Sequence, residues 1–215
     1  MRNIFNYENG FMSTINAIAD SLILGILWVI CSLPVFTIGA SSAAFYYAYN
    51  KCVRQKTDYI LRTFFAGFRS NFKQATQIWL IVLGICLVIA ADWYLLRLIE
   101  NAAALVPVIR TLLMAVLAAV AIWTLYLFPY LSRFENTGRD ILKNCALIAL
   151  ANLPRSLLLL VLFFLCAVGF VSFPLLNLLF PAGFMFFLNK LLEPVFQRYA
   201  AISPDGKQYK VTPIQ

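Results

Sequence analysis

The sequence lacks histidine altogether, and only nine of its 215 residues are Asp or Glu. Histidine is the usual general base near neutral pH and the commonest metal ligand, so its absence removes the ordinary route to both chemistries. The sequence also contains no Walker A loop, no G-x-G-x-x-G fingerprint and no G-x-S-x-G nucleophile elbow. We therefore expect that the protein is not an enzyme and has no catalytic residue, cofactor site or metal site.

Charge is scarce as well, since charged residues make up 12% of the chain and hydrophobic residues 62%. Soluble domains contain about half apolar and about a quarter charged residues. A soluble core of this chain length cannot bury so much apolar surface, whereas helices that face lipid can expose it. The composition indicates an integral membrane protein with an all-α fold, a polytopic bundle of transmembrane helices.

The net charge of +8 comes from Lys and Arg residues that cluster in the segments between apolar runs. That distribution is the positive-inside pattern of membrane proteins, in which short basic segments stay in the cytoplasm. No basic patch belongs to a soluble face, so we expect no nucleic-acid partner. The pattern favours a multi-pass protein of the plasma membrane, with the lipid bilayer as its surroundings.

Apolar runs of spanning length predict about five membrane spans in one domain of residues 1–215. Three spans are expected at residues 17–33, 75–96 and 111–131, and residues 156–188 hold enough apolar sequence for two short spans. Five spans leave the N-terminus outside and the C-terminus in the cytoplasm, together with nearly every basic cluster. Four spans, the alternative, would leave the basic tail outside, against the positive-inside rule.

Three shorter segments complete this arrangement. Residues 1–16 are near neutral and carry aromatic side chains, so we expect them to form an arm at the membrane interface. Phe173-Pro174 and Asn177 permit a tight outer turn between the last two spans. Residues 190–215 are expected to form a cytoplasmic tail.

A break in the helical pattern follows the first span. Pro34 lacks an N–H group and disfavours helical backbone at the residue before it, and Gly39 offers backbone conformations closed to other residues. Ser41 and Ser42 can then cap a new helix. We interpret that helix, which contains a tyrosine cluster, as a short tilted element leading out of the membrane, with a re-entrant segment as the alternative. The candidate structural break or functional element consists of Pro34, Thr37, Gly39, Ser41 and Ser42.

The basic segment after this break is predicted to contain an amphipathic helix. Apolar residues, Phe64 and Phe68 among them, recur at helical spacing, while Arg62, Arg69 and Lys73 fall on a different side. A helix of this kind lies on the cytoplasmic leaflet, with its basic side chains near anionic headgroups. A docking surface for a partner protein is the alternative.

Several stretches of the sequence resemble the YesL-like family of bacterial multi-pass membrane proteins of unknown function. The resemblance is densest between Asp20 and Trp79, and length and hydropathy order extend it to the whole chain. The family often has Asn where this chain has Gly25, so no polar role is expected there. The stretches that carry the resemblance are Ile26-Leu27-Trp28, Ser32-Leu33-Pro34-Val35-Phe36-Thr37-Ile38-Gly39-Ala40, Ala44, Lys51, Tyr59, Phe64-Phe65, Phe68 and Asn71-Phe72-Lys73-Gln74-Ala75.

The resemblance implies a setting in the bacterial plasma membrane and a link to carbohydrate uptake, because family members are commonly associated with binding-protein-dependent sugar importers. It supplies no catalytic or binding residues. We expect a non-enzymatic accessory or regulatory protein whose partners are carbohydrate importer or sensor subunits. A small-solute channel or carrier acting as a homo-oligomer is the alternative, since irregular backbone at membrane depth is tolerated where it lines a cavity. The oligomeric state stays open.

The expected topology can be tested with a reporter protein that is active only in the cytoplasm. Attached after Gln215, the reporter should give a signal, because five spans starting outside end inside the cell. A silent fusion would contradict the five-span arrangement, provided that the same reporter placed within the basic segment of residues 51–59 is active.

Overall fold

The computed structural model describes residues 4–55, 59–98, 105–172 and 179–202, and all of its regular structure there is helical. Both the α-helical fold class and the long apolar helices agree with the sequence. Five helices are long and apolar enough to cross a membrane. In chain order the elements are α1 (Ile4–Ser32), η1 (Val35–Thr37), α2 (Ile38–Ala48), η2 (Tyr49–Arg54), α3 (Ile60–Leu98), α4 (Val106–Arg133), α5 (Gly138–Ala151), α6 (Leu153–Ser172) and α7 (Leu179–Ile202).

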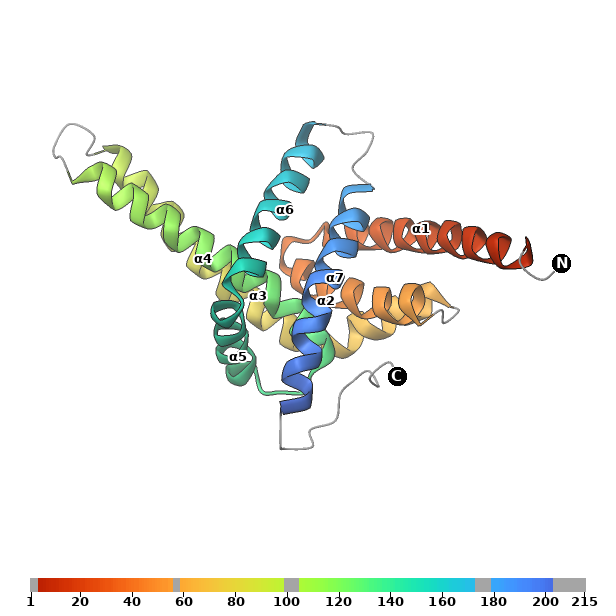
Figure 1. The fold of residues 1–215 in the computed structure, drawn as a ribbon. Helices are drawn as coiled ribbons and strands as arrows, with labels where there is room; N and C mark the ends of the chain where they lie inside the picture. The colour runs from red at the N-terminus through yellow and green to blue at the C-terminus, as the bar shows by residue number, and fades with distance from the viewer. Residues whose placement is uncertain (1–3, 56–58, 99–104, 173–178, 203–215) are drawn as a thin grey trace.

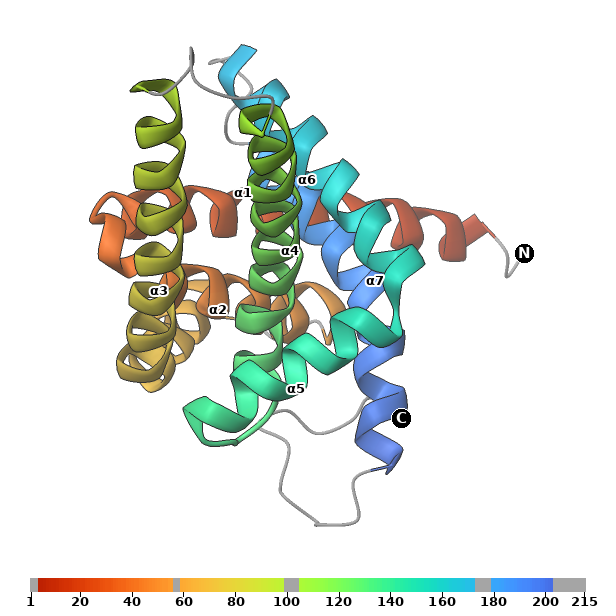
Figure 2. The same cartoon turned by 90° about the vertical axis from the view of Figure 1, so that its left-hand side faces the viewer.

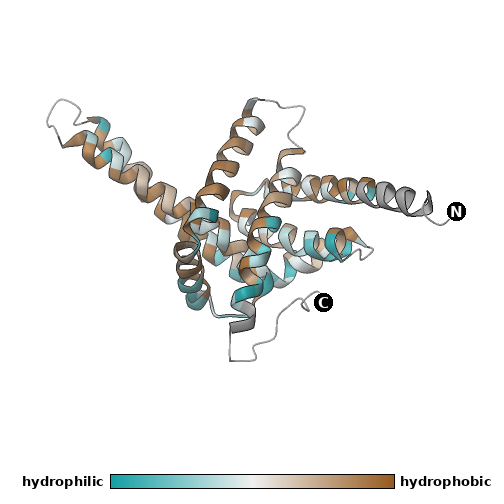
Figure 3. Cartoon of the chain, in the orientation of Figure 1, coloured by the Kyte–Doolittle hydropathy of each residue, from teal (hydrophilic) through white to brown (hydrophobic). Residues whose placement is uncertain are grey.

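The helices form two long pairs, α3 with α4 and α6 with α7, that point away from a common base (Figure 1). Helix α2 lies in the middle of this base, against α1, α3 and α4. Helix α1 runs crosswise to α6 and α7 in both views (Figures 1 and 2). Hydrophilic residues gather at the base, where α2, α5 and the end of α7 meet, while the shafts of the pairs are hydrophobic (Figure 3).

Three predicted segments turn out to be parts of longer helices. The expected arm of residues 1–16 is continuous with α1 from Ile4 onward. The predicted amphipathic helix and the second span are one uninterrupted helix, α3. Helix α7 continues to Ile202 through the first part of the expected tail, because Leu192, Val195 and Phe196 are buried in the core. The expected turn at 173–177 lies outside the described residues.

The break after α1 exists and is held by side chains. Helix α1 ends at Ser32, and Pro34 has extended backbone before the short turn η1. The Thr37 hydroxyl donates to the carbonyl oxygens of Cys31, at 2.7 Å, and Pro34, at 2.6 Å. The Trp79 indole of α3 donates to the Val35 carbonyl at 2.7 Å. The bond to Cys31 satisfies a carbonyl that the end of α1 leaves without a helical partner, and the other two fix the turn that follows.

The serines do not cap α2, contrary to the sequence-based prediction. Thr37 occupies the N-cap position and makes no side-chain capping bond. Ser41 and Ser42 lie inside the helix, where Ser42 accepts a hydrogen bond from the Trp28 indole at 3.1 Å. Because α2 begins earlier than the serines suggest, its small residues are free to contact neighbouring helices.

Two tyrosines, Tyr46 near the end of α2 and Tyr49 at the start of η2, are buried inside the protein. Tyr46 is 0% exposed and Tyr49 is 5% exposed. Most of α2 is buried because its alanines and Gly39 let other helices approach closely, as small residues do between membrane helices. Helix α2 is therefore an interior element of the helix bundle.

Gly39 is needed for space rather than for an unusual backbone conformation. A Cβ atom at this position would lie 2.8 Å from the Phe128 ring, 2.8 Å from Trp79 Cβ and 2.9 Å from the Ala75 carbonyl oxygen. Helices α2, α3 and α4 therefore meet at a point where one hydrogen atom fits and a methyl group does not. Trp79 and Phe128 complete the contact, with their ring centroids 5.9 Å apart.

Replacing Gly39 with alanine should destabilise the protein. The added methyl group has to displace backbone and ring atoms of two other helices, and overpacking of this kind costs about 1–3 kcal/mol. Denaturant titration of the detergent-purified chain, followed by tryptophan fluorescence, measures the free energy of unfolding.

The matched control is Gly84→Ala in α3, where a Cβ atom would meet nothing within 4 Å. This control should leave the unfolding free energy unchanged or slightly raised, because alanine favours helix over glycine. Equal stability of the two variants would contradict the close three-helix contact.

Candidate functional site

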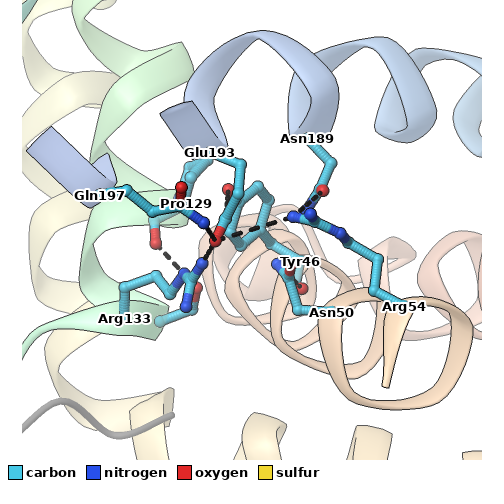
Figure 4. A network of polar contacts seen from close by, with 9 residues as sticks. Tyr46, Asn50, Arg54, Pro129, Arg133, Asn189, Glu193 and Gln197 are labelled. Carbon is cyan, nitrogen blue, oxygen red and sulfur yellow. Dashed lines mark hydrogen bonds and ion pairs between the residues drawn. The ribbon is translucent and has the colours of Figure 1, made fainter. Parts of the chain in front are cut away.

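A cluster of buried polar side chains joins α2, η2, α4 and α7 at the base of the molecule (Figure 4). Glu193 of α7 lies at its centre and is 3% exposed. Arg133, the last residue of α4, forms an ion pair with the Glu193 carboxylate. Arg54 of η2 approaches the same carboxylate at 3.7 Å, and the Tyr46 hydroxyl donates to it at 3.3 Å. A single acidic side chain thus ties three separate parts of the chain together.

The chain changes from the α-helix α2 to the π-helix η2 without a break, and this change sets the direction of the side chains that η2 contributes to the cluster. Tyr46, Asn50 and Arg54 are spaced four residues apart, across the junction between the α-helix α2 and the π-helix η2. The Gln55 amide donates to the Asn50 carbonyl at 3.2 Å, which is the i to i+5 bond of a π-helix. The Asn50 amide group donates back to the Tyr46 carbonyl at 3.0 Å. Such wide turns occur often at functional sites because they redirect side chains.

An internal proline lies next to each member of the ion pair. Pro129 precedes Arg133 by one helical turn, and Pro194 directly follows Glu193. Proline removes one backbone hydrogen bond and bends a helix, and membrane helices tolerate it where neighbouring groups compensate. The ion pair therefore joins the two helices within about one turn of a proline on each.

The cluster carries more positive than negative charge. Two guanidinium groups, those of Arg54 and Arg133, face one carboxylate. Burial raises the pKa of Tyr46 to about 12, so its hydroxyl keeps its proton at neutral pH and serves as a donor. The Gln197 amide adds a further donor to Glu193 at 3.4 Å. Several hydrogen-bond donors and two cationic groups therefore surround this one carboxylate.

A cavity of about 350 Å³ lies beside the cluster, between η2 and α7. Arg54, Asn189 and Lys190 line it on the polar side, and the Arg54 guanidinium donates to the Asn189 side-chain oxygen at 3.1 Å. Three buried atoms of the cluster have no hydrogen-bond partner in the structure: Asn50 Oδ1, Arg133 Nε and Asn189 Nδ2. Unpaired polar atoms and cationic side chains thus adjoin this cavity.

The residues singled out from the sequence lie elsewhere. Pro34, Thr37 and Gly39 form the break and the three-helix contact. Arg62, Arg69 and Lys73 are exposed on α3, as expected for a surface. The two phenylalanines expected beside them are not surface residues: Phe64 is 0% exposed and Phe68 packs against the core with its ring 6.4 Å from that of Phe64. Phe64 is therefore part of the core, and Phe68 is partly buried against it.

Sequence analysis missed Glu193 and Arg133 as site residues because both stand near the end of an apolar run. At such positions an isolated charge is usually solvated. Two signals were available: a glutamate followed by proline inside the helical pattern of α7, and an arginine one turn after Pro129. Neither signal indicates which charges meet, since the pairing depends on how α4 and α7 pack.

Replacing Glu193 with glutamine should destabilise the protein strongly. The substitution leaves the buried Arg133 guanidinium without its counter-ion, and breaking a buried pair in this way costs about 3–5 kcal/mol. The free energy of unfolding in detergent measures this loss. Glu135→Gln, at an exposed glutamate, is the matched control and should change stability by less than about 0.5 kcal/mol.

A double variant tests whether the loss comes from the ion pair itself. Glu193→Gln combined with Arg133→Gln should be less destabilising than the sum of the two single substitutions, because no unpaired charge is left in α4. Strict additivity would show that the two side chains act independently and would contradict the pairing.

Comparison with known proteins gives two consistent similarities. Residues 22–93 match the family described as "Protein of unknown function, DUF624". The uncharacterized protein YesL of Bacillus subtilis (strain 168) is 25% identical over 214 residues, which cover 98% of this chain and 97% of the relative. No solved structure matches the chain.

The two similarities cover different parts of the site. The family match spans the break, α2, η2 and most of α3, and therefore includes Gly39 and Arg54. Arg133 and Glu193 fall outside it, in the part that only the full-length similarity covers. The cluster thus joins the matched segment to the rest of the chain.

Proposed function

We propose that the chain, which is similar to the uncharacterized protein YesL over almost its whole length, is a non-enzymatic accessory protein of a bacterial carbohydrate importer. In this proposal it docks an importer or sensor subunit through the first part of α3. The carbohydrate context rests on what the family resemblance implies. The docking role rests on the shape and chemistry of α3.

The observation that carries the docking role is the length of α3 together with its exposed face. The helix has 39 residues, so it is about 58 Å long, roughly twice the thickness of the hydrocarbon layer. The apolar shaft lies toward its C-terminal end, and the first part lies at the hydrophilic base (Figure 3). A helix of this length reaches beyond the bilayer and presents a surface there.

That surface, which we call the α3 face, has an apolar strip beside a basic strip. Helical geometry places Leu61, Phe65 and Phe72 in one row, and these side chains are 57%, 51% and 37% exposed. Arg62, Arg69 and Lys73 form the adjacent row. The opposite side of the helix, with Phe64, Gly67 and Asn71, is already buried. A complementary partner would present an apolar stripe bordered by carboxylates.

The same face could also rest on the anionic membrane surface, where each basic residue contributes about 1 kcal/mol. The two roles differ in their specificity. An anionic lipid surface attracts any exposed pair of basic residues, wherever the pair lies on the protein. A protein partner, in contrast, distinguishes the α3 face from other helix faces.

A solute carrier is the second candidate, and the buried cluster favours it. Glu193 lies inside the apolar window of α7, and ionisable residues at such positions commonly mark solute or proton pathways. The cavity beside it could hold a small solute. A chain of this size would need several copies to enclose a pathway, so this candidate requires a homo-oligomer.

Co-purification from native membranes in mild detergent, followed by quantitative mass spectrometry, tests the docking role. Arg69→Glu with Lys73→Glu should reduce recovery of importer or sensor subunits about tenfold or more, since like charges then face the partner's carboxylates. Arg139→Glu with Lys143→Glu is the matched control, because this pair is also exposed and has the same spacing on α5. The control should retain its companions.

Other outcomes contradict the docking role in distinguishable ways. Equal losses in the two variants would mean that overall charge, rather than the α3 face, governs recovery. Recovery of the chain with copies of itself alone would favour the carrier, and flux into proteoliposomes would then be the relevant assay.

A further inference from the structure

We propose that the cavity between η2 and α7 binds the phosphate group of an anionic ligand, supplied by a lipid headgroup or a soluble phosphate ester. This inference does not depend on the docking role. It rests on the charges that line the cavity, on the apolar side chains beside them and on the incomplete pairing of Arg54, whose guanidinium is drawn near Asn189 and Glu193 in Figure 4.

The charges at the cavity favour an anion. Arg54 and Lys190 line it from η2 and α7, and Glu193 is the acidic residue among its lining side chains. Glu193 is already paired with Arg133, which lies outside the lining. Three cations against one carboxylate leave an excess of two positive charges around the cavity. A dianionic or monoanionic phosphate would offset that excess.

Arg54 keeps donors available because its pairing with Glu193 is loose. Its guanidinium lies 3.7 Å from the carboxylate, beyond the usual distance of a charge-assisted hydrogen bond, and its side chain is 35% exposed. Asn189 accepts one of its hydrogen bonds at 3.1 Å. A planar guanidinium carries five N–H donors, so several can still reach a phosphate oxygen.

The rest of the lining suits a ligand that is polar at one end. Tyr49, Phe186 and Pro194 supply an apolar wall, and Phe186 is 50% exposed on the outer surface of α7. Lys190 Nζ lies 6.0 Å from the centre of the Phe186 ring, so the cationic and apolar parts adjoin. Basic pockets between membrane helices bind anionic headgroups in this way. The volume of about 350 Å³ lies within the range of small-ligand sites, roughly 300–1,000 Å³.

Thermal unfolding of the full chain in a zwitterionic detergent tests this inference. Phosphatidylglycerol, phosphatidylcholine, glycerol phosphate and inorganic phosphate are titrated separately, with chloride at matched ionic strength as the salt control. A ligand that binds only the folded chain raises the unfolding temperature. Phosphatidylglycerol, inorganic phosphate or glycerol phosphate should raise it, and phosphatidylcholine and chloride should not.

Variants locate the binding at this cavity. Arg54→Gln and Lys190→Gln should each weaken the effective ligand's binding about tenfold, since each removes a charge-assisted hydrogen bond. Lys143→Gln on α5 removes an exposed cation away from the lining and should bind as the parent does. Lys190 is exposed and belongs to neither of the ion pairs that Glu193 makes, so Lys190→Gln still tests the site if Arg54→Gln folds poorly.

The separate titrations distinguish a lipid headgroup from a soluble phosphate ester as the source of the bound phosphate. A shift with phosphatidylglycerol alone identifies a lipid headgroup, and a shift with glycerol phosphate or inorganic phosphate identifies a soluble ester; either supports the site. No shift with any phosphate compound, or equal weakening in Lys143→Gln and Lys190→Gln, would overturn it.

Discussion

The close approach of three helices at Gly39 is the constraint on which the rest of the structure depends. Helix α2 can lie in the interior only because its small residues admit α3 and α4 at backbone distance. Once α2 is held there, the π-helix that continues it carries Arg54 toward α7, and the Tyr46 hydroxyl comes within reach of Glu193. The polar cluster therefore depends on apolar packing one turn or more away. A substitution that weakens the packing at Gly39 is expected to weaken the cluster as well.

Glu193 gives the base of the molecule a specificity that apolar contacts alone would not supply. Apolar helix faces can slide against one another, whereas a buried carboxylate is stable only when its cationic partners are in place. The pairing with Arg133 fixes the end of α4 against α7, and the looser contact with Arg54 adds η2. The excess positive charge that remains is what makes the adjoining cavity suited to an anion.

Much of the fold could be predicted from the sequence, because hydropathy and length report directly on long apolar helices. The break at Pro34 was also predictable, since proline acts locally. The role of Gly39 was not, because a glycine needed for space looks the same in sequence as one needed for conformation. The surface of α3 was predicted only in part. Its periodicity is clear, but which side Phe64 takes depends on α2, a helix whose apolar residues favour no one side and give no directional signal. The pairing of Arg133 with Glu193 joins residues 60 positions apart in the chain and has no local signature.

Because α1 runs crosswise to α6 and α7, its orientation determines whether the chain crosses the membrane an even or an odd number of times. The two helix pairs, α3 with α4 and α6 with α7, each leave the base and come back to it, so together they contribute an even number of crossings (Figure 1). An even number returns the chain to the side from which α3 departs. Helix α1 then decides the sides of the two ends: if it lies along the bilayer, both ends are on one side, and if it passes through the bilayer, they are on opposite sides. The orientation of this single helix thus sets which face of the membrane receives the N-terminus, while the base with its charged cluster keeps its side in either case.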